Sequence, residues 1–330
     1  MPSVTVAQAE TMFLESIGRH RSANTVQTYR KVLETFSNLL VAQQIDPMNF
    51  PTNELTENSI IHFVDHMKDF SPATESLYLQ VIKSFYEFLD AENLTLVNPS
   101  RVRLLIRKRT RRSRAQLLEY PEDDIKHLIE FMSNLQKISS LDHGATDNSE
   151  LRNLRDRALI LTLADTGLRV DEICKLGCGD IDWERSRAIL KGRGNKQAVV
   201  RFSKRAINAL RDYLSHRESL DLEAGKPLSS LPLFARHDKG AGKKIKPITS
   251  TTARRIVAEC VYQILGREAT GTITPHTFLH YFVTTILRAT GNLKLAQVLA
   301  RHSNIQVTQR YAHINEDELD KGYYEIFEKK

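Results

Sequence analysis

Residues 299–314 read LARHSNIQVTQRYAHI and place His302 nine residues before Tyr311. A second stretch, residues 274–287, reads TPHTFLHYFVTTIL and carries His276 just after a proline. Proline favours the first turn of a helix, and apolar residues then recur at helical spacing. The two stretches therefore predict helices that bring a phenol and two imidazoles into the second half of the chain.

Two further segments add cations to this set. Residues 164–176 read ADTGLRVDEICKL and contain Arg169, with Glu172 one helical turn away, close enough to form an ion pair. Residues 190–197 read LKGRGNKQ and lie between two runs rich in β-forming residues. A Gly-Asn turn between such runs predicts a β-hairpin.

Together the four segments resemble the catalytic domain of tyrosine recombinases, the integrase and Xer-type family. That family has an arginine in a TGLR-x-x-E context, a hairpin lysine, H-x-x-R on a helix, and a histidine nine residues before the tyrosine. The resemblance implies that Tyr311 is the nucleophile and that Arg169 and His302 bind the phosphate. It implies that His276 transfers a proton or contacts the phosphate. It also implies cutting and rejoining of DNA through a 3′-phosphotyrosyl intermediate, without a metal or other cofactor.

The chemistry of a phosphodiester explains these residue types. Nucleophilic attack adds negative charge at phosphorus, so the site must hold fixed cations against it. Arginine suits this role because its planar fork binds two phosphate oxygens and keeps its proton. A tyrosine ester conserves the bond energy needed for rejoining. A base must accept the phenol proton, and an acid must protonate the leaving 5′-oxygen.

Residue 279 departs from the family pattern, because the H-x-x-R arginine is replaced by Leu279. The spacing around it is intact, and a leucine can neither carry charge nor donate a hydrogen bond. Loss of one preorganised donor typically slows catalysis by about 10²–10³-fold. Arg301 is a nearby cation that could reach the phosphate instead. Whether natural or introduced, Leu279 predicts a weakened recombinase or, alternatively, a recombinase-derived protein that only binds DNA.

The predicted hairpin is the second departure. Its turn reads G-R-G-N-K, with Arg193 at the position of the family's lysine. An ammonium group can give a proton to the leaving oxygen, whereas a guanidinium practically cannot. Lys191 and Lys196 flank the turn, and either could be the general acid. Arg193 is then expected to contact the phosphate backbone.

The first half of the chain reads as a helical bundle. Residues 1–97 are expected to form a helical core-binding, SAM-like DNA-binding domain, residues 98–118 a basic linker, and residues 119–330 the catalytic domain with a tail helix. Within the first domain one apolar stripe follows helical spacing: Val26, Tyr29, Leu33, Phe36 and Leu40. The expected fold is therefore mainly α with a small β-sheet, in two domains that clamp DNA.

Basic clusters suggest where DNA is bound. Residues 101–114 carry eight bases and no acid, a run that repels itself unless phosphates neutralise it. A second basic loop lies within residues 239–246. The residues expected to bind DNA are Arg107, Lys108, Arg109, Arg111, Arg112, Arg193, Lys243 and Lys244.

Composition agrees with a nucleic-acid partner. The net charge is +7, and a basic excess favours polyanions. No run approaches the ~18 apolar residues that span a bilayer. Cys174, Cys178 and Cys260 form no recognisable metal pattern, which indicates buried packing residues in a reduced, cytoplasmic protein.

The tail indicates assembly. Residues Ile314, Leu319 and Phe327 suggest an amphipathic helix after the tyrosine. The family resemblance implies that such a helix docks on a neighbouring subunit within a synaptic tetramer on double-stranded DNA, with accessory proteins possible. A type IB topoisomerase has a similar site and remains an alternative, although it needs no such assembly.

Overall fold

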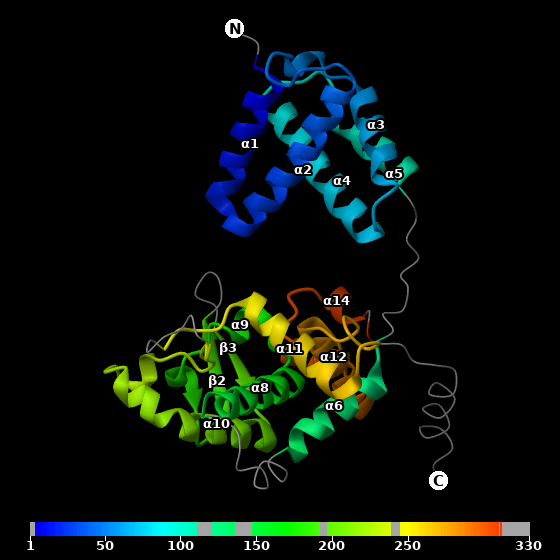
Figure 1. Cartoon of the computed structure of the whole chain (residues 1–330). Coiled ribbons are helices and arrows are strands. Elements are labelled where there is room, and N and C mark those ends of the chain that lie inside the picture. The colour runs from blue at the N-terminus through cyan, green and yellow to red at the C-terminus, as the bar shows by residue number, and fades with distance from the viewer. Residues whose placement is uncertain are drawn as a thin grey trace, which may run out of the picture. The chain divides into compact units, whose positions relative to one another are not determined.

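The computed structural model describes residues 4–110, 120–135, 147–191, 197–238, 245–309 and residue 311. The chain divides into two compact units, Met1–Gln116 and Leu117–Lys330, and each unit has its own hydrophobic core (Figure 1). The described residues form helices and a three-stranded sheet. The predicted fold class, mainly α with a small sheet, is confirmed.

The first unit is a helical bundle. Its elements are α1 (Val6–His20), α2 (Ala23–Ala42), the 3-10 turn η1 (Thr52–Glu54), α3 (Glu57–Met67), α4 (Pro72–Ala91) and α5 (Pro99–Arg109). A side-chain oxygen at the residue before α1, α2 and α4 accepts a hydrogen bond from a backbone N–H of the first turn. Such caps satisfy donors that a helix start leaves unpaired. Ser71 caps α4 ahead of Pro72, a combination that favours a helix start.

Aromatic rings fill the centre of this bundle. Phe36 on α2 and Phe85 on α4 are fully buried, with ring centroids 6.4 Å apart. Phe63 on α3 meets Phe36 edge-on at 5.6 Å. The apolar stripe predicted for residues 26–40 forms the inner face of α2, because its members are buried or packed against this core.

Helix α5 lies within the stretch that the sequence suggests as a linker. Asn98 caps it, and Val102 is fully buried against the first unit, where α5 packs on α3 and α4. Three of its arginines pair with acids of the same unit: Arg101 with Glu57, Arg103 with Glu87 and Arg109 with Asp65. Residues 111–119, including Arg111 and Arg112, lie outside the described residues.

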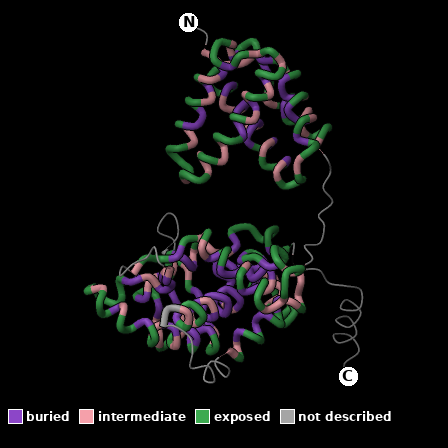
Figure 2. Tube along the Cα trace, in the orientation of Figure 1, coloured by how far each residue is buried: buried purple, intermediate pink, exposed green. Residues whose placement is uncertain are grey.

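The second unit surrounds one long buried helix. Its elements are α6 (Glu122–Asn134), α8 (Asp147–Thr166), α9 (Val170–Ile173), η2 (Cys178–Asp180), β1 (Ile181–Asp182), β2 (Arg187–Lys191), β3 (Gln197–Arg201), α10 (Lys204–Glu223), η4 (Leu228–Ser230), α11 (Ser250–Leu265), α12 (Pro275–Thr290), α13 (Leu293–Leu299) and α14 (Ile305–Gln309). Helix α8 packs against α6, α10, α11 and α12, and the buried residues gather along it (Figure 2). The chain emerges from this core at Thr166, directly before the turn that carries Arg169.

The sheet is antiparallel in the order β1-β2-β3. Ala188 pairs with Val200 and both are buried, whereas the neighbouring pair of Ile189 and Val199 is exposed. This alternation is expected when one face of a sheet covers a core. The predicted hairpin is confirmed, and its turn, residues 192–196, lies outside the described residues.

Candidate active site

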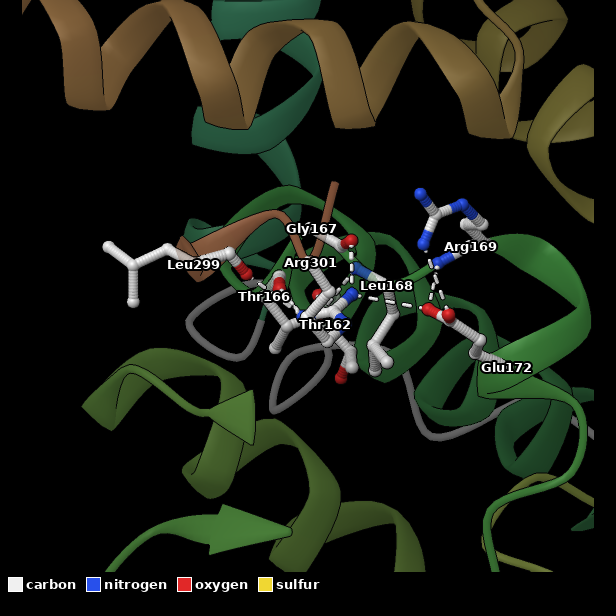
Figure 3. A network of polar contacts seen from close by, with 8 residues as sticks. All are labelled: Thr162, Thr166, Gly167, Leu168, Arg169, Glu172, Leu299 and Arg301. Atoms are coloured by element: carbon white, nitrogen blue, oxygen red, sulfur yellow. Dashed lines mark hydrogen bonds and ion pairs between the residues drawn. The ribbon is translucent and has the colours of Figure 1, made fainter. Parts of the chain in front are cut away.

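The turn after α8 carries Arg169 at the start of α9. Glu172 holds it twice: the carboxylate accepts a hydrogen bond from the Arg169 backbone N–H at 2.9 Å and from its guanidinium at 3.2 Å (Figure 3). The Arg169 side chain is 43% exposed. The ion pair expected from the sequence is therefore present, and it orients a guanidinium that solvent and ligands can still reach.

Gly167 shapes this turn. Its φ is +59°, in the left-handed region that residues with a Cβ rarely adopt. A Cβ on Gly167 would lie 2.4 Å from the ring of Phe282 on α12. The turn that carries Arg169 thus lies directly against the helix that carries His276, and only glycine fits between them.

Helix α12 contributes two histidines one turn apart. Thr274 caps the helix, Pro275 occupies its first turn, and His276 follows on the exposed side. Partial burial, together with the nearby Arg169, lowers the pKa of His276. Burial, with a contribution from His276, lowers the pKa of His280 to about 4. Both imidazoles are therefore neutral at pH 7, and a neutral ring can accept a proton.

Tyr311 lies among histidine rings. Its ring centroid is 4.6 Å from that of His280 at a steep angle, and 6.2 Å from that of His302 in a stacked arrangement. His302 is buried, and its Nδ1 lies 2.9 Å from the Thr308 hydroxyl. Burial, Arg169 and Arg301 lower the pKa of His302, in that order of effect. The structure thus places the predicted nucleophile next to the ring of the predicted second histidine.

Leu279 is only 3% exposed. It packs with Val283 of the same helix and with Ala296 and Ala300, in a small apolar cluster that Tyr311 also borders. Leu279 is therefore an apolar side chain in an apolar environment.

Arg301, which the sequence suggested as an alternative phosphate contact, binds groups of the protein itself. Its side chain is 11% exposed, and its two terminal nitrogens bind Glu172 and three backbone carbonyl oxygens (Figure 3). Arg288, on α12, pairs with Glu122 instead. Of Arg169, Arg288 and Arg301, Arg169 is the one that lines a pocket beside His276.

A pocket of ≈ 480 Å³ adjoins these groups. Arg169, His276 and Leu279 line it, and so does Arg254 of α11. Arg254 is exposed, and no ion pair holds it among the described residues. Sequence reasoning missed Arg254 because it lies in an ordinary amphipathic helix with no motif around it.

The structure describes only some of the remaining predicted residues. Lys191 ends β2, and nothing is described of its side chain. Arg193, Lys196, Lys243 and Lys244 lie outside the described residues. Arg107 and Lys108 are exposed on α5, and no carboxylate pairs with either of them in the part of the chain that the structure describes.

No group of three His, Cys, Asp or Glu side chains that could hold a metal occurs among the described residues. No described helix is long and apolar enough to cross a membrane. The three cysteines are free and buried, as predicted.

A helical unit followed by a catalytic unit with a tyrosine, two histidines and an ion-paired arginine defines the tyrosine recombinase class. Residues 121–318 match the model of the phage integrase family, and residues 12–93 match that of the phage integrase N-terminal SAM-like domain. The chain belongs to the phage integrase family.

Similar proteins cover nearly its whole length. The chain is 30% identical over 317 residues to the tyrosine recombinase XerC of Bacillus pumilus, covering 94% of this chain and 93% of the relative. It is also 30% identical to the tyrosine recombinase XerD of Rickettsia bellii, over 94% and 96%.

Solved structures share the fold. The Tn1549 transposon integrase in complex with a circular intermediate DNA has a TM-score of 0.68 at 18% identity, covering 98% of this chain and 100% of that one. The XerH site-specific recombinase bound to its difH substrate has a TM-score of 0.64 at 18% identity, covering 97% and 84%.

Proposed function

We propose that this chain recombines double-stranded DNA at specific sites, with Tyr311 as the nucleophile. The observation that carries the proposal is the placement of the Tyr311 ring beside the His302 ring, with centroids 6.2 Å apart, in the unit where Glu172 holds Arg169. These groups come from two separate segments of the chain, residues 164–176 and 299–314. Their meeting is what attack on a phosphodiester requires, because a nucleophile, a proton acceptor and a fixed cation must act on one phosphorus.

The proposed cleavage step forms one bond to phosphorus and breaks one. The Tyr311 oxygen forms a bond to phosphorus, the phosphorus–5′-oxygen bond breaks, and the phenol proton passes to a neutral imidazole, for which we favour His276. Lys191 or Lys196 gives a proton to the leaving 5′-oxygen. Arg169 and His302 bind the phosphate oxygens as charge develops on them. Rejoining is the reverse, with a 5′-hydroxyl attacking the phosphotyrosine.

Leu279 makes this chain a slow recombinase. With a leucine there, the developing charge is met by Arg169 and by uncharged donors. A second candidate function, DNA binding without cleavage, follows from the same observation. A protein that only binds DNA would tolerate an apolar, well-packed residue at this position, and Leu279 is 3% exposed.

A covalent-adduct assay separates the two functions. Duplexes bound by the chain are selected from a random pool, nicked beside the presumed scissile position, and incubated with the protein before denaturing electrophoresis. A recombinase leaves a DNA-linked band that Tyr311→Phe abolishes and the control Tyr281→Phe retains. Specific binding without an adduct, even after Leu279→Arg, indicates a protein that binds DNA without cutting it. An adduct that survives Tyr311→Phe refutes the assignment of the nucleophile.

We also propose that the two units clamp DNA and that subunits assemble into a tetramer on it, in the cytoplasm. The basic residues of α5 support the DNA contact. Exposed apolar side chains on α13 and α14 support a protein contact near Tyr311: Leu295, Val298, Ile305 and Val307. Deleting the residues after Glu318 should leave binding of one subunit intact and weaken the higher-order complexes in native gels. Unchanged complexes would mean that the tail does not link subunits.

A further inference from the structure

Arg301 stands directly before His302 in an unusual backbone conformation. Its φ is +57°, in the left-handed region that disfavours residues with a Cβ. Arginine has no local advantage there over glycine. Such a conformation persists only where contacts with the surroundings stabilise it. We therefore attribute the left-handed backbone at Arg301 to the contacts of its side chain.

Those contacts converge on the turn that carries Arg169. One terminal nitrogen of Arg301 donates to the carbonyl oxygens of Leu299 at 3.0 Å and Thr166 at 3.4 Å. The other donates to the Gly167 carbonyl at 2.6 Å and to the Glu172 carboxylate at 3.1 Å (Figure 3). The Nε–H is buried and has no acceptor among the described residues. Every nitrogen of this guanidinium is thus turned to the protein or shielded by it.

Glu172 is the shared partner. One carboxylate oxygen accepts from the Arg169 guanidinium, and the other accepts from both the Arg169 backbone and Arg301. A carboxylate held from two sides has little freedom to rotate, and so the Arg169 side chain that it holds also loses freedom. Without Arg301, Glu172 would keep only contacts within its own turn.

We propose that Arg301 is a positioning residue for DNA cleavage: by holding Glu172 and the Gly167 carbonyl, it keeps Arg169 oriented toward the scissile phosphate. The proposal rests on the proposed recombinase function. Arg301 does not replace the missing contact at position 279, because its own nitrogens are engaged or buried. Its effect is transmitted through Arg169, and it adds positive charge next to His302.

Cleavage of two substrates tests this role. One carries the natural scissile phosphate, and the other a methylphosphonate, which has no negative charge and depends less on an oriented cation. Arg301→Ala should slow single-turnover cleavage of the phosphate more than tenfold, with unchanged DNA affinity, and should slow the methylphosphonate much less. Arg301→Lys should recover part of the rate, because lysine can still pair with Glu172. The matched control is Arg217→Ala, which removes a fully buried guanidinium bound to Asp221, away from the site.

Arg217→Ala should lower the melting temperature and affect both substrates equally. If Arg301→Ala gives the same equal loss, or no loss, the proposal is overturned.

A second measurement does not need activity. The His302 ring can be titrated by NMR in the free protein, and Arg301→Ala should raise its pKa, whereas Arg217→Ala should not. If no variant forms a DNA adduct, the proposed function fails while this titration still shows whether Arg301 sets the charge of the site. An unchanged His302 pKa after Arg301→Ala overturns the proposal even if the chain is an active recombinase.

Discussion

Leu279→Arg tests the site most directly. Leu279 packs against Val283 and Ala300 on one side, and lines the pocket with Arg169 and His276 on the other. An arginine there can extend into the pocket and place a second guanidinium near the one already present. A preorganised donor at the developing charge contributes about 2.7–4 kcal/mol, so cleavage should become about 10²–10³-fold faster. The melting temperature should fall, because a buried apolar contact is lost.

Single-turnover cleavage rates of the unchanged chain, Leu279→Arg and Leu279→Met provide the measurement. Methionine has comparable reach but no charge, so Leu279→Met should stay slow. DNA affinity should change little, because phosphate contacts elsewhere dominate binding. Equal rates for the unchanged chain and Leu279→Arg would refute the reasoning, since the site would then lack no donor. Equal acceleration by methionine would show that packing, rather than charge, limits the rate.

Three further outcomes follow from the described contacts. Gly167→Ala should slow cleavage at least about tenfold and lower the melting temperature, whereas Gly291→Ala, with a similar φ but open space around it, should lower only the melting temperature. Replacing Arg107 and Lys108 by Ala should reduce the salt dependence of DNA binding by about two units of slope, and an unchanged slope would show that neither meets a phosphate. Because the pKa of His280 is about 4 in the fold, against an ordinary 6.5, the unfolded chain binds the proton first. Stability should therefore fall as pH drops from 6.5 toward 4, and His280→Gln should flatten this part of a melting-temperature curve; an unaltered curve would contradict the low pKa.

Local sequence patterns were enough for much of the fold. The cap and proline at Ser71, the apolar spacing of α2, and the β-forming runs around the basic turn each act over a few residues, and each feature is present. Helix α5 was missed because its many bases hide a short apolar repeat, Val102 and Ile106, that packs on the bundle.

Only those residues of the site that belong to a motif of fixed spacing were predictable from the sequence. Tyr311, His302 and Arg169 are indicated by the resemblance of their motifs to those of the family, and their catalytic roles stay predictions. The engagement of Arg301 depends on a left-handed backbone and on a turn far away in the sequence, and no local pattern encodes either one. Arg254 is likewise brought to the pocket only by the packing of α11.

The contact between Gly167 and the Phe282 ring has a consequence for how such sequences can diverge. Position 167 cannot accept a larger residue while an aromatic ring fills the adjoining space, and a smaller residue at 282 would leave a void beneath the turn. Because the φ of +59° disfavours a Cβ at position 167 whatever residue stands at 282, a change at 282 alone should not free position 167. Laboratory libraries that vary α12 alone should lose most of their functional members at residue 282, whatever is selected at the DNA-facing positions.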